Sequence, residues 1–137
     1  MARPPVALPP DVARWLRVGV ALVAALILLQ VLWELLLAPV RPGGSWLALK
    51  ALPLALAWAP LARGSPRARF VVLLLLLPCF AEAMTRTVAE SGRHALVAGM
   101  AAALTAAAFF ALLLSFRAAK RHRLGAVRKP PDSVSDL

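Results

Sequence analysis

Four long apolar stretches, separated by short segments rich in proline, glycine and charge, limit what this chain can fold into. The clearest of them covers 95–116, which is 22 residues without a charged side chain. At ~1.5 Å per helical residue it reaches about 33 Å, enough to cross a hydrocarbon core of ~30 Å. Inside lipid every backbone polar group needs a partner within the protein, which helices provide. This stretch is therefore predicted to be a transmembrane helix.

The other three stretches are predicted at 18–40, 46–62 and 70–88. Proline, glycine and charged residues gather between consecutive stretches and indicate tight turns, so neighbouring helices must reverse direction. The sequence therefore predicts an all-α integral membrane protein, an antiparallel bundle of four transmembrane helices over 18–117. The second helix has only 17 residues and contains Pro53, so it is the shortest that could span.

Composition supports the membrane assignment. Hydrophobic residues make up 61% of the chain, against roughly 45–50% in soluble domains. A chain of 137 residues cannot hide this excess inside one small globule. A cleaved secretory signal is the other interpretation of the first stretch, but its apolar part would be only about 7–15 residues long. We therefore expect the first helix to be retained.

The basic residues predict the orientation of the four helices. There are 16 Lys and Arg against six Asp and Glu, and the four-span layout places 12 of the 16 on one side. The positive-inside rule makes that side the cytoplasm, so both termini are predicted there: 1–17 as a leading segment and 118–137 as a mobile basic tail. The basic residues flank apolar stretches instead of alternating with aromatics, so no nucleic-acid partner is predicted. Besides the bilayer itself, anionic lipids are possible partners of four of them: Arg117, Lys120, Arg121 and Arg123.

Polar side chains within the apolar stretches are the candidate site, because an ionisable group at membrane depth costs ~2.5–3.5 kcal/mol. Helical spacing predicts that they cluster in the outer leaflet. Two interpretations remain open. The cluster either binds a headgroup, a small solute or a partner helix, or forms two salt bridges, Glu34 with Lys50 and Glu82 with Arg86, that fix helix register. The cluster consists of Gln30, Glu34, Lys50, Glu82 and Arg86.

Small residues recur at every fourth position of the last helix, a pattern that favours close helix packing. They predict a packing seam, facing either the first helix or a second copy of the chain in a homo-oligomer. Small residues are also about half of this helix, so the pattern is weak. The seam residues are Ala95, Gly99, Ala103, Ala107, Ala111 and Ser115.

Tryptophans lie near the predicted ends of the helices. Trp15, Trp33 and Trp46 fall close to the expected membrane interfaces, where indole rings commonly anchor. Trp58 lies nearer the inner end of the second helix. We interpret them as interface residues and not as a ligand cage.

The sequence contains no catalytic, metal-binding or cofactor-binding motif. It has no glycine-rich phosphate loop, no HExxH and no CxxC. The single Cys79 can form no intrachain disulfide, and the histidines, His94 and His122, are far apart in the sequence. No cofactor is predicted, and we do not expect an enzyme.

Two segments resemble a known family. They are the first hairpin, with Trp46, Lys50 and Pro53, and the motif Phe80-x-Glu82-x-x-x-Arg86. Over roughly 20–117 the chain is similar to small proteobacterial inner-membrane proteins that share a domain of unknown function. In those proteins a tyrosine commonly precedes the phenylalanine and a glycine follows the glutamate, where this chain has cysteine and alanine. The resemblance implies a multi-pass protein of the bacterial inner membrane with four helices, and it implies no activity.

The small size leaves few residues outside the helices. We therefore expect an accessory or assembly protein. The alternatives are an oligomeric transporter or channel component for a small solute, whose broken helices Pro53 and Pro78 could supply, and a membrane-embedded enzyme that uses the outer-leaflet carboxylates.

Overall fold

A computed structural model of the protein describes residues 8–37 and 45–128, with the side chains of 34–37 and 45–50 left out of the description. These residues form four helices: α1 (Pro10–Leu37), α2 (Ser45–Ala62), α3 (Pro66–Ala89) and α4 (Arg93–Arg128). The predicted all-α fold is confirmed. Three described segments are long and apolar enough to cross a membrane, Pro10–Trp33, Pro66–Ala89 and Arg93–Arg128, whereas the apolar segment Ala51–Ala62 of α2 is shorter.

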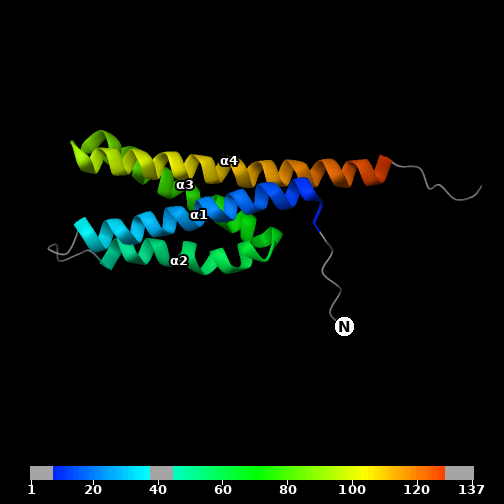
Figure 1. Ribbon diagram of the computed structural model, residues 1–137, viewed down its shortest axis with the longest axis horizontal. Coiled ribbons are helices and arrows are strands. Elements are labelled where there is room, and N and C mark those ends of the chain that lie inside the picture. Colours follow the sequence, from blue (N-terminus) through cyan, green and yellow to red (C-terminus); the bar gives the residue numbers. More distant parts are fainter. Residues whose placement is uncertain (1–7, 38–44, 129–137) are drawn as a thin grey trace, which may run out of the picture.

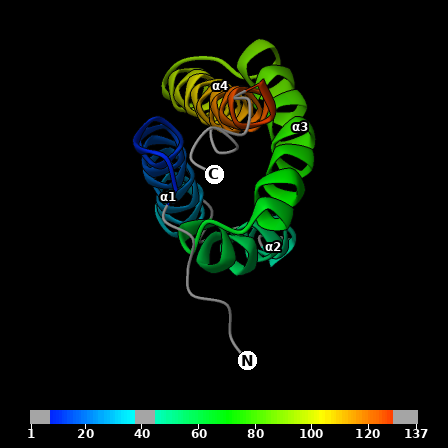
Figure 2. The same cartoon turned by 90° about the vertical axis from the view of Figure 1, so that its right-hand side faces the viewer.

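The four helices pack in a ring, which is visible when the molecule is viewed end-on (Figure 2). Helices α1 and α3 each contact both α2 and α4, and the contact of α1 with α4 is the most extensive. The beginning of α1 and the last part of α4 lie at the same end (Figure 1). Leucines from all four helices meet in the core, including Leu26, Leu54, Leu76 and Leu112.

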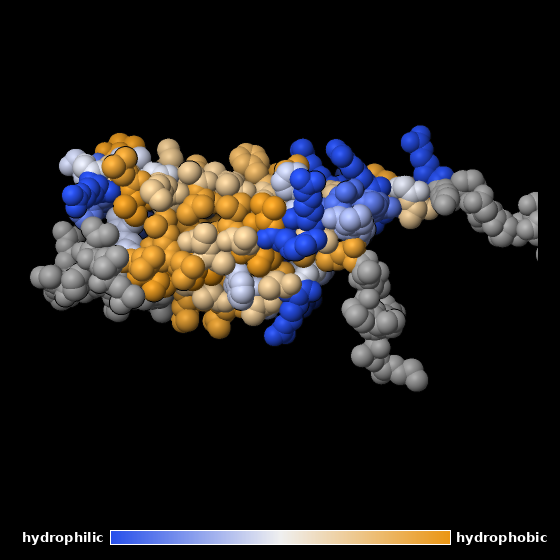
Figure 3. Space-filling view, viewed as in Figure 1, coloured by the Kyte–Doolittle hydropathy of each residue, from blue (hydrophilic) through white to orange (hydrophobic). Residues whose placement is uncertain are grey.

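The outer surface of the ring is apolar. Large hydrophobic side chains such as Leu28, Leu56 and Phe110 are more than half exposed. In the space-filling view hydrophobic residues form a broad belt, and hydrophilic residues gather toward its two ends (Figure 3). An apolar surface of this extent on a monomer marks a region that water does not solvate.

The turn between α2 and α3 shows how local sequence ends one helix and begins the next. Gly64 has φ +82°, which glycine adopts readily, and its N–H donates to the carbonyl of Leu61 at 3.0 Å. The N–H of Ser65 donates to the carbonyl of Pro60 at 3.2 Å, and the two bonds together form a Schellman motif. Ser65 then caps α3, with Pro66 in the first turn, where a missing N–H does no harm.

Helix α4 is longer than predicted. The expected end was residue 116, followed by a mobile tail over 118–137, but the helix continues to Arg128. Ala, Lys, Arg and Leu between 117 and 124 are strong helix formers, and the first proline after the helix is Pro130. The basic residues from Arg117 onward show where the apolar stretch ends, but the helix continues through them. Helix α1 likewise extends beyond its apolar stretch at 18–40: it begins at Pro10, where Pro9, Pro10 and Asp11 indicate a helix start.

The central contact between α1 and α4 depends on Gly19. A Cβ atom at this position would lie 2.7 Å from Cδ2 and 3.0 Å from Cγ of Leu112, whose side chain is fully buried. Real Cβ atoms do not approach so closely, so any larger residue would require the Leu112 side chain or the two helices to shift. In lipid, helix association relies on such close packing because water does not drive it.

We predict that Gly19→Ala destabilises the protein by about 1–3 kcal/mol, the usual penalty for overpacking. The measurement is the thermal melting of the purified protein in detergent. Gly125→Ala is the matched control, because nothing lies within 4 Å of its new Cβ. Adding Leu112→Val should recover part of the loss in a double-mutant cycle. Equal melting temperatures for both alanine variants would contradict the close approach.

Candidate functional site

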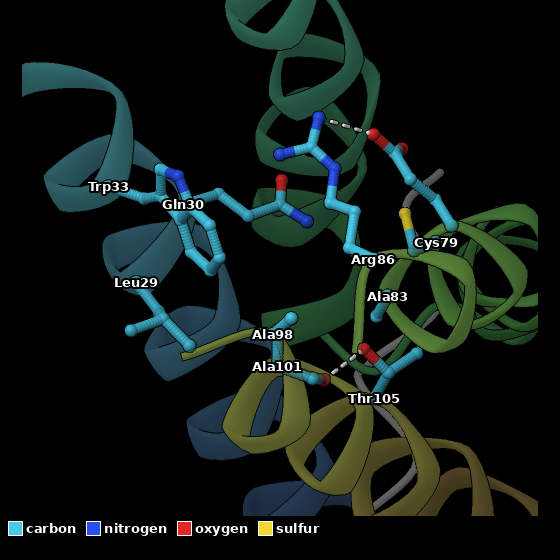
Figure 4. Close-up of a pocket in the computed structure, with 10 residues that line it drawn as sticks. Leu29, Gln30, Trp33, Cys79, Ala83, Arg86, Ala98, Ala101 and Thr105 are labelled. Atoms are coloured by element: carbon cyan, nitrogen blue, oxygen red, sulfur yellow. Dashed lines mark hydrogen bonds and ion pairs between the residues drawn. The ribbon is translucent and has the colours of Figure 1, made fainter. Parts of the chain in front are cut away.

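A pocket lies between α1, α3 and α4, near the end of the bundle where α4 begins (Figure 4). Its cavity volume is about 60 Å³, room for a few water-sized groups. Apolar groups form most of its wall, and a few polar side chains converge on it. The lining residues are Leu29, Gln30, Trp33, Cys79, Glu82, Ala83, Arg86, Ala98, Ala101 and Thr105.

The predicted ion pair of α3 is present in this pocket. Nη2 of Arg86 lies 3.0 Å from Oε1 of Glu82, and the two side chains are about 30% exposed. The i,i+4 spacing places both on one face of the helix, which is why the sequence was sufficient to predict the pair. Because these two charges cancel, the described residues of the pocket offer dipoles and hydrogen-bonding groups without a net charge.

Gln30 brings α1 into the same pocket. Its amide points toward Arg86 (Figure 4), so Gln30 and the α3 pair line the same pocket. The side chains of Glu34 and Lys50 lie outside the described residues. Their predicted ion pair therefore stays a prediction.

Trp33 contributes contacts that the sequence did not indicate. The guanidinium carbon of Arg86 lies 5.8 Å from the centroid of the Trp33 ring, within the range of a cation–π interaction. The same indole lies 6.3 Å from the ring of His94 at the start of α4. Trp33 thus links α1 to both α3 and α4, whereas it was interpreted only as an interface residue.

Thr105 is a second residue that the sequence analysis did not single out. It is buried, and its hydroxyl donates to the carbonyl of Ala101 at 2.7 Å, so the hydroxyl oxygen stays available as an acceptor at the pocket wall. It lies in an alanine-rich stretch without a recognisable motif. Cys79, expected to be a small packing residue, also lines the pocket. Among the described residues, no three His, Cys, Asp or Glu side chains are grouped as a metal site.

The six residues of the predicted seam do not share one buried face of α4. Ala111 and Ser115 are buried and Ala95 and Gly99 partly so, but Ala103 and Ala107 are exposed. A four-residue step advances about 40° beyond one full turn of an α-helix, so a strict repeat of four winds around the helix. The buried face instead follows steps of three and four: Ala98, Ala102, Thr105, Ala108, Leu112 and Ser115. Contact of the exposed seam residues with a second copy stays a prediction.

An all-helical fold with an apolar outer surface and a few converging polar side chains defines a multi-helix membrane protein. The model of the DUF2069 family, described as a predicted membrane protein, matches residues 18–120. This is most of the chain, which therefore belongs to that family, and the resemblance to a membrane family of unknown function is confirmed. No curated protein and no solved structure matches the chain.

We predict that Glu82→Gln destabilises the protein, because it leaves the charge of Arg86 uncompensated in the pocket. The loss should fall between the ~1 kcal/mol of an exposed pair and the ~3–5 kcal/mol of a buried one, since both side chains are partly exposed. Melting in detergent measures it. Adding Arg86→Met should restore much of the stability, and Asp11→Asn, which removes an exposed carboxylate, should change little. A double variant less stable than Glu82→Gln would contradict a mainly structural ion pair.

Proposed function

We propose that this protein is a four-span accessory protein of the bacterial inner membrane, antiparallel, with both termini in the cytoplasm. The apolar belt supports a position within the bilayer (Figure 3). Helix α2 has 18 residues and so reaches about 27 Å, close to the thickness of the hydrocarbon core. The uneven distribution of Lys and Arg supports the orientation. The exposed basic residues of the α4 extension, Arg117, Lys120, Arg121 and Arg123, would then face anionic lipids of the inner leaflet.

The pocket near the outer end supports an accessory role best. At about 60 Å³ it accommodates one small polar group, such as the end of a side chain. Its only described charges, Glu82 and Arg86, are paired with one another, so it favours a neutral polar group over an ion. A polar side chain on the helix of a partner membrane protein has this chemistry, and such groups associate helices within lipid. We infer that the protein docks to a partner helix through this pocket and is not an enzyme.

The alternatives need features beyond this pocket. An oligomeric transporter would need a continuous pathway, which the single chain could supply only together with further copies. A membrane enzyme would need an acid or base free of its structural partner, whereas Glu82 is held by Arg86. The small neutral pocket therefore carries the accessory proposal.

The orientation can be tested by labelling single cysteines with a membrane-impermeant maleimide in spheroplasts. In a Cys79→Ser background, Ser91→Cys in the turn between α3 and α4 should react from outside. Arg63→Cys, in the turn between α2 and α3, should react only after the membrane is permeabilised. Both positions are exposed, so accessibility of the side chain does not distinguish them. Labelling of position 63 in intact spheroplasts would overturn the orientation.

The docking proposal can be tested by placing a photo-crosslinking amino acid at position 29 in living cells. Leu29 lines the pocket, and Leu56 on the exposed face of α2 serves as the matched control position. A discrete crosslinked product should form from position 29 and disappear when Glu82→Gln and Arg86→Met are combined. Position 56 should give only diffuse lipid adducts. The same products from both positions would contradict a partner docked at the pocket.

A further inference from the structure

Arg69 is a buried charge at the opposite end of the bundle from the pocket. It lies in the first turn of α3 and is only 5% exposed. Its Nη1 donates to Oγ of Ser115 on α4 at 3.5 Å, and its guanidinium carbon lies 4.9 Å from the ring centroid of Phe116. Its Nε is buried and has no hydrogen-bond partner. At least one donor of the Arg69 guanidinium therefore makes no hydrogen bond within the described part of the chain.

Ser115 is oriented toward the arginine by its own backbone contact. Its hydroxyl donates to the carbonyl of Leu112 at 2.6 Å, so its oxygen faces Arg69 as an acceptor. A hydroxyl is neutral and the bond is long, so it does not balance the charge of the guanidinium. The contact holds Arg69 in place without neutralising it.

The described acids do not neutralise Arg69 either. Asp11 lies 3.6 Å from Nε2 of His122, and Glu82 is paired with Arg86 in the pocket. Glu90 follows the last residue of α3, whereas Arg69 lies in the first turn. A second cation, Arg123, lies two helical turns after Phe116 on the same face of α4, and its charge acts on Arg69. A buried charge without an opposite charge is costly, and a bound anion would lower that cost.

We propose that a phosphate group binds between α3 and α4, where it accepts hydrogen bonds from Arg69 and bridges it to Arg123. The planar guanidinium fork matches the oxygens of a phosphate, and several oxygens allow one phosphate to contact two arginines. Exposed basic residues surround this end of the bundle, including Arg63, Arg67 and Arg117, and raise the local concentration of anions. The phosphate belongs either to the headgroup of a phospholipid or to a soluble phosphate compound. The site is separate from the pocket that would bind a partner helix.

The test uses the full-length protein in neutral detergent, titrated with phosphatidylglycerol, phosphatidylcholine or inorganic phosphate while the melting temperature is followed. Phosphatidylglycerol should raise the melting temperature and phosphatidylcholine should not. Arg69→Met should weaken the apparent affinity about tenfold or more, the loss expected when charge-assisted hydrogen bonds are removed. Arg67 is an exposed arginine in the same helical turn and contributes only to the general positive potential at this end of the bundle. Arg67→Met should therefore change the apparent affinity less than about twofold.

Inorganic phosphate separates the two sources. A stabilisation by inorganic phosphate that depends on Arg69 assigns the site to soluble phosphates, whereas stabilisation by phosphatidylglycerol alone assigns it to a headgroup. Arg123→Gln is the second variant, because this side chain is exposed and its removal does not disturb packing. It should weaken binding severalfold, and Arg128→Gln, at an exposed arginine near the end of α4, should not. Equal affinities for the wild type and Arg69→Met, or equal losses for Arg123→Gln and Arg128→Gln, would overturn the proposal.

Discussion

The inability of lipid to solvate polar groups explains most of the side-chain contacts in this structure. Each threonine in the described helices turns its hydroxyl back onto the carbonyl four residues earlier: Thr85 onto Ala81, Thr87 onto Ala83 and Thr105 onto Ala101. The indole N–H of Trp58 reaches the carbonyl of Val20 on α1 at 3.1 Å. Such groups would each cost several kcal/mol if they faced hydrocarbon unpaired. Because these polar groups are hydrogen-bonded within the chain, the outer surface stays apolar. The described polar groups that converge lie at two places between helices: the pocket and the surroundings of Arg69.

Those two places differ in charge, and this difference separates the chemistry that each can recognise. At one end Glu82 and Arg86 neutralise each other beside Gln30, so a ligand there is selected by shape and hydrogen bonding. At the other end Arg69 has a hydroxyl and an aromatic ring as neighbours, and no described acid forms a salt bridge with it. The unbalanced positive charge of Arg69 favours an anionic ligand, whatever the shape of that ligand. The two sites that we propose would therefore hold a neutral group at one end of the bundle and an acidic group at the other.

Features encoded over a few consecutive residues could be predicted from the sequence, and features that depend on helix rotation could not. The turns follow from local proline and glycine, and the Glu82–Arg86 pair follows from i,i+4 spacing. Two contacts join residues far apart in the sequence: Trp33 with Arg86, and Arg69 with Ser115. Both depend on which face each helix turns toward its neighbours once the helices are packed. Arg69 was counted only as a topology signal, because exposed and buried arginines are indistinguishable by composition.

The apolar contact between Gly19 and Leu112 determines where the polar groups of α4 lie. It fixes the rotation of α4 against α1, because the missing side chain of Gly19 admits Leu112 at this position. Thr105 lies seven residues before Leu112, and Ser115 lies three residues after it. At 100° per residue both fall within about 60° of Leu112 around the helix. With Leu112 packed on Gly19, Thr105 lies at the pocket and Ser115 lies against Arg69. The same close apolar approach is therefore compatible with both candidate sites and holds α4 in the orientation that they need.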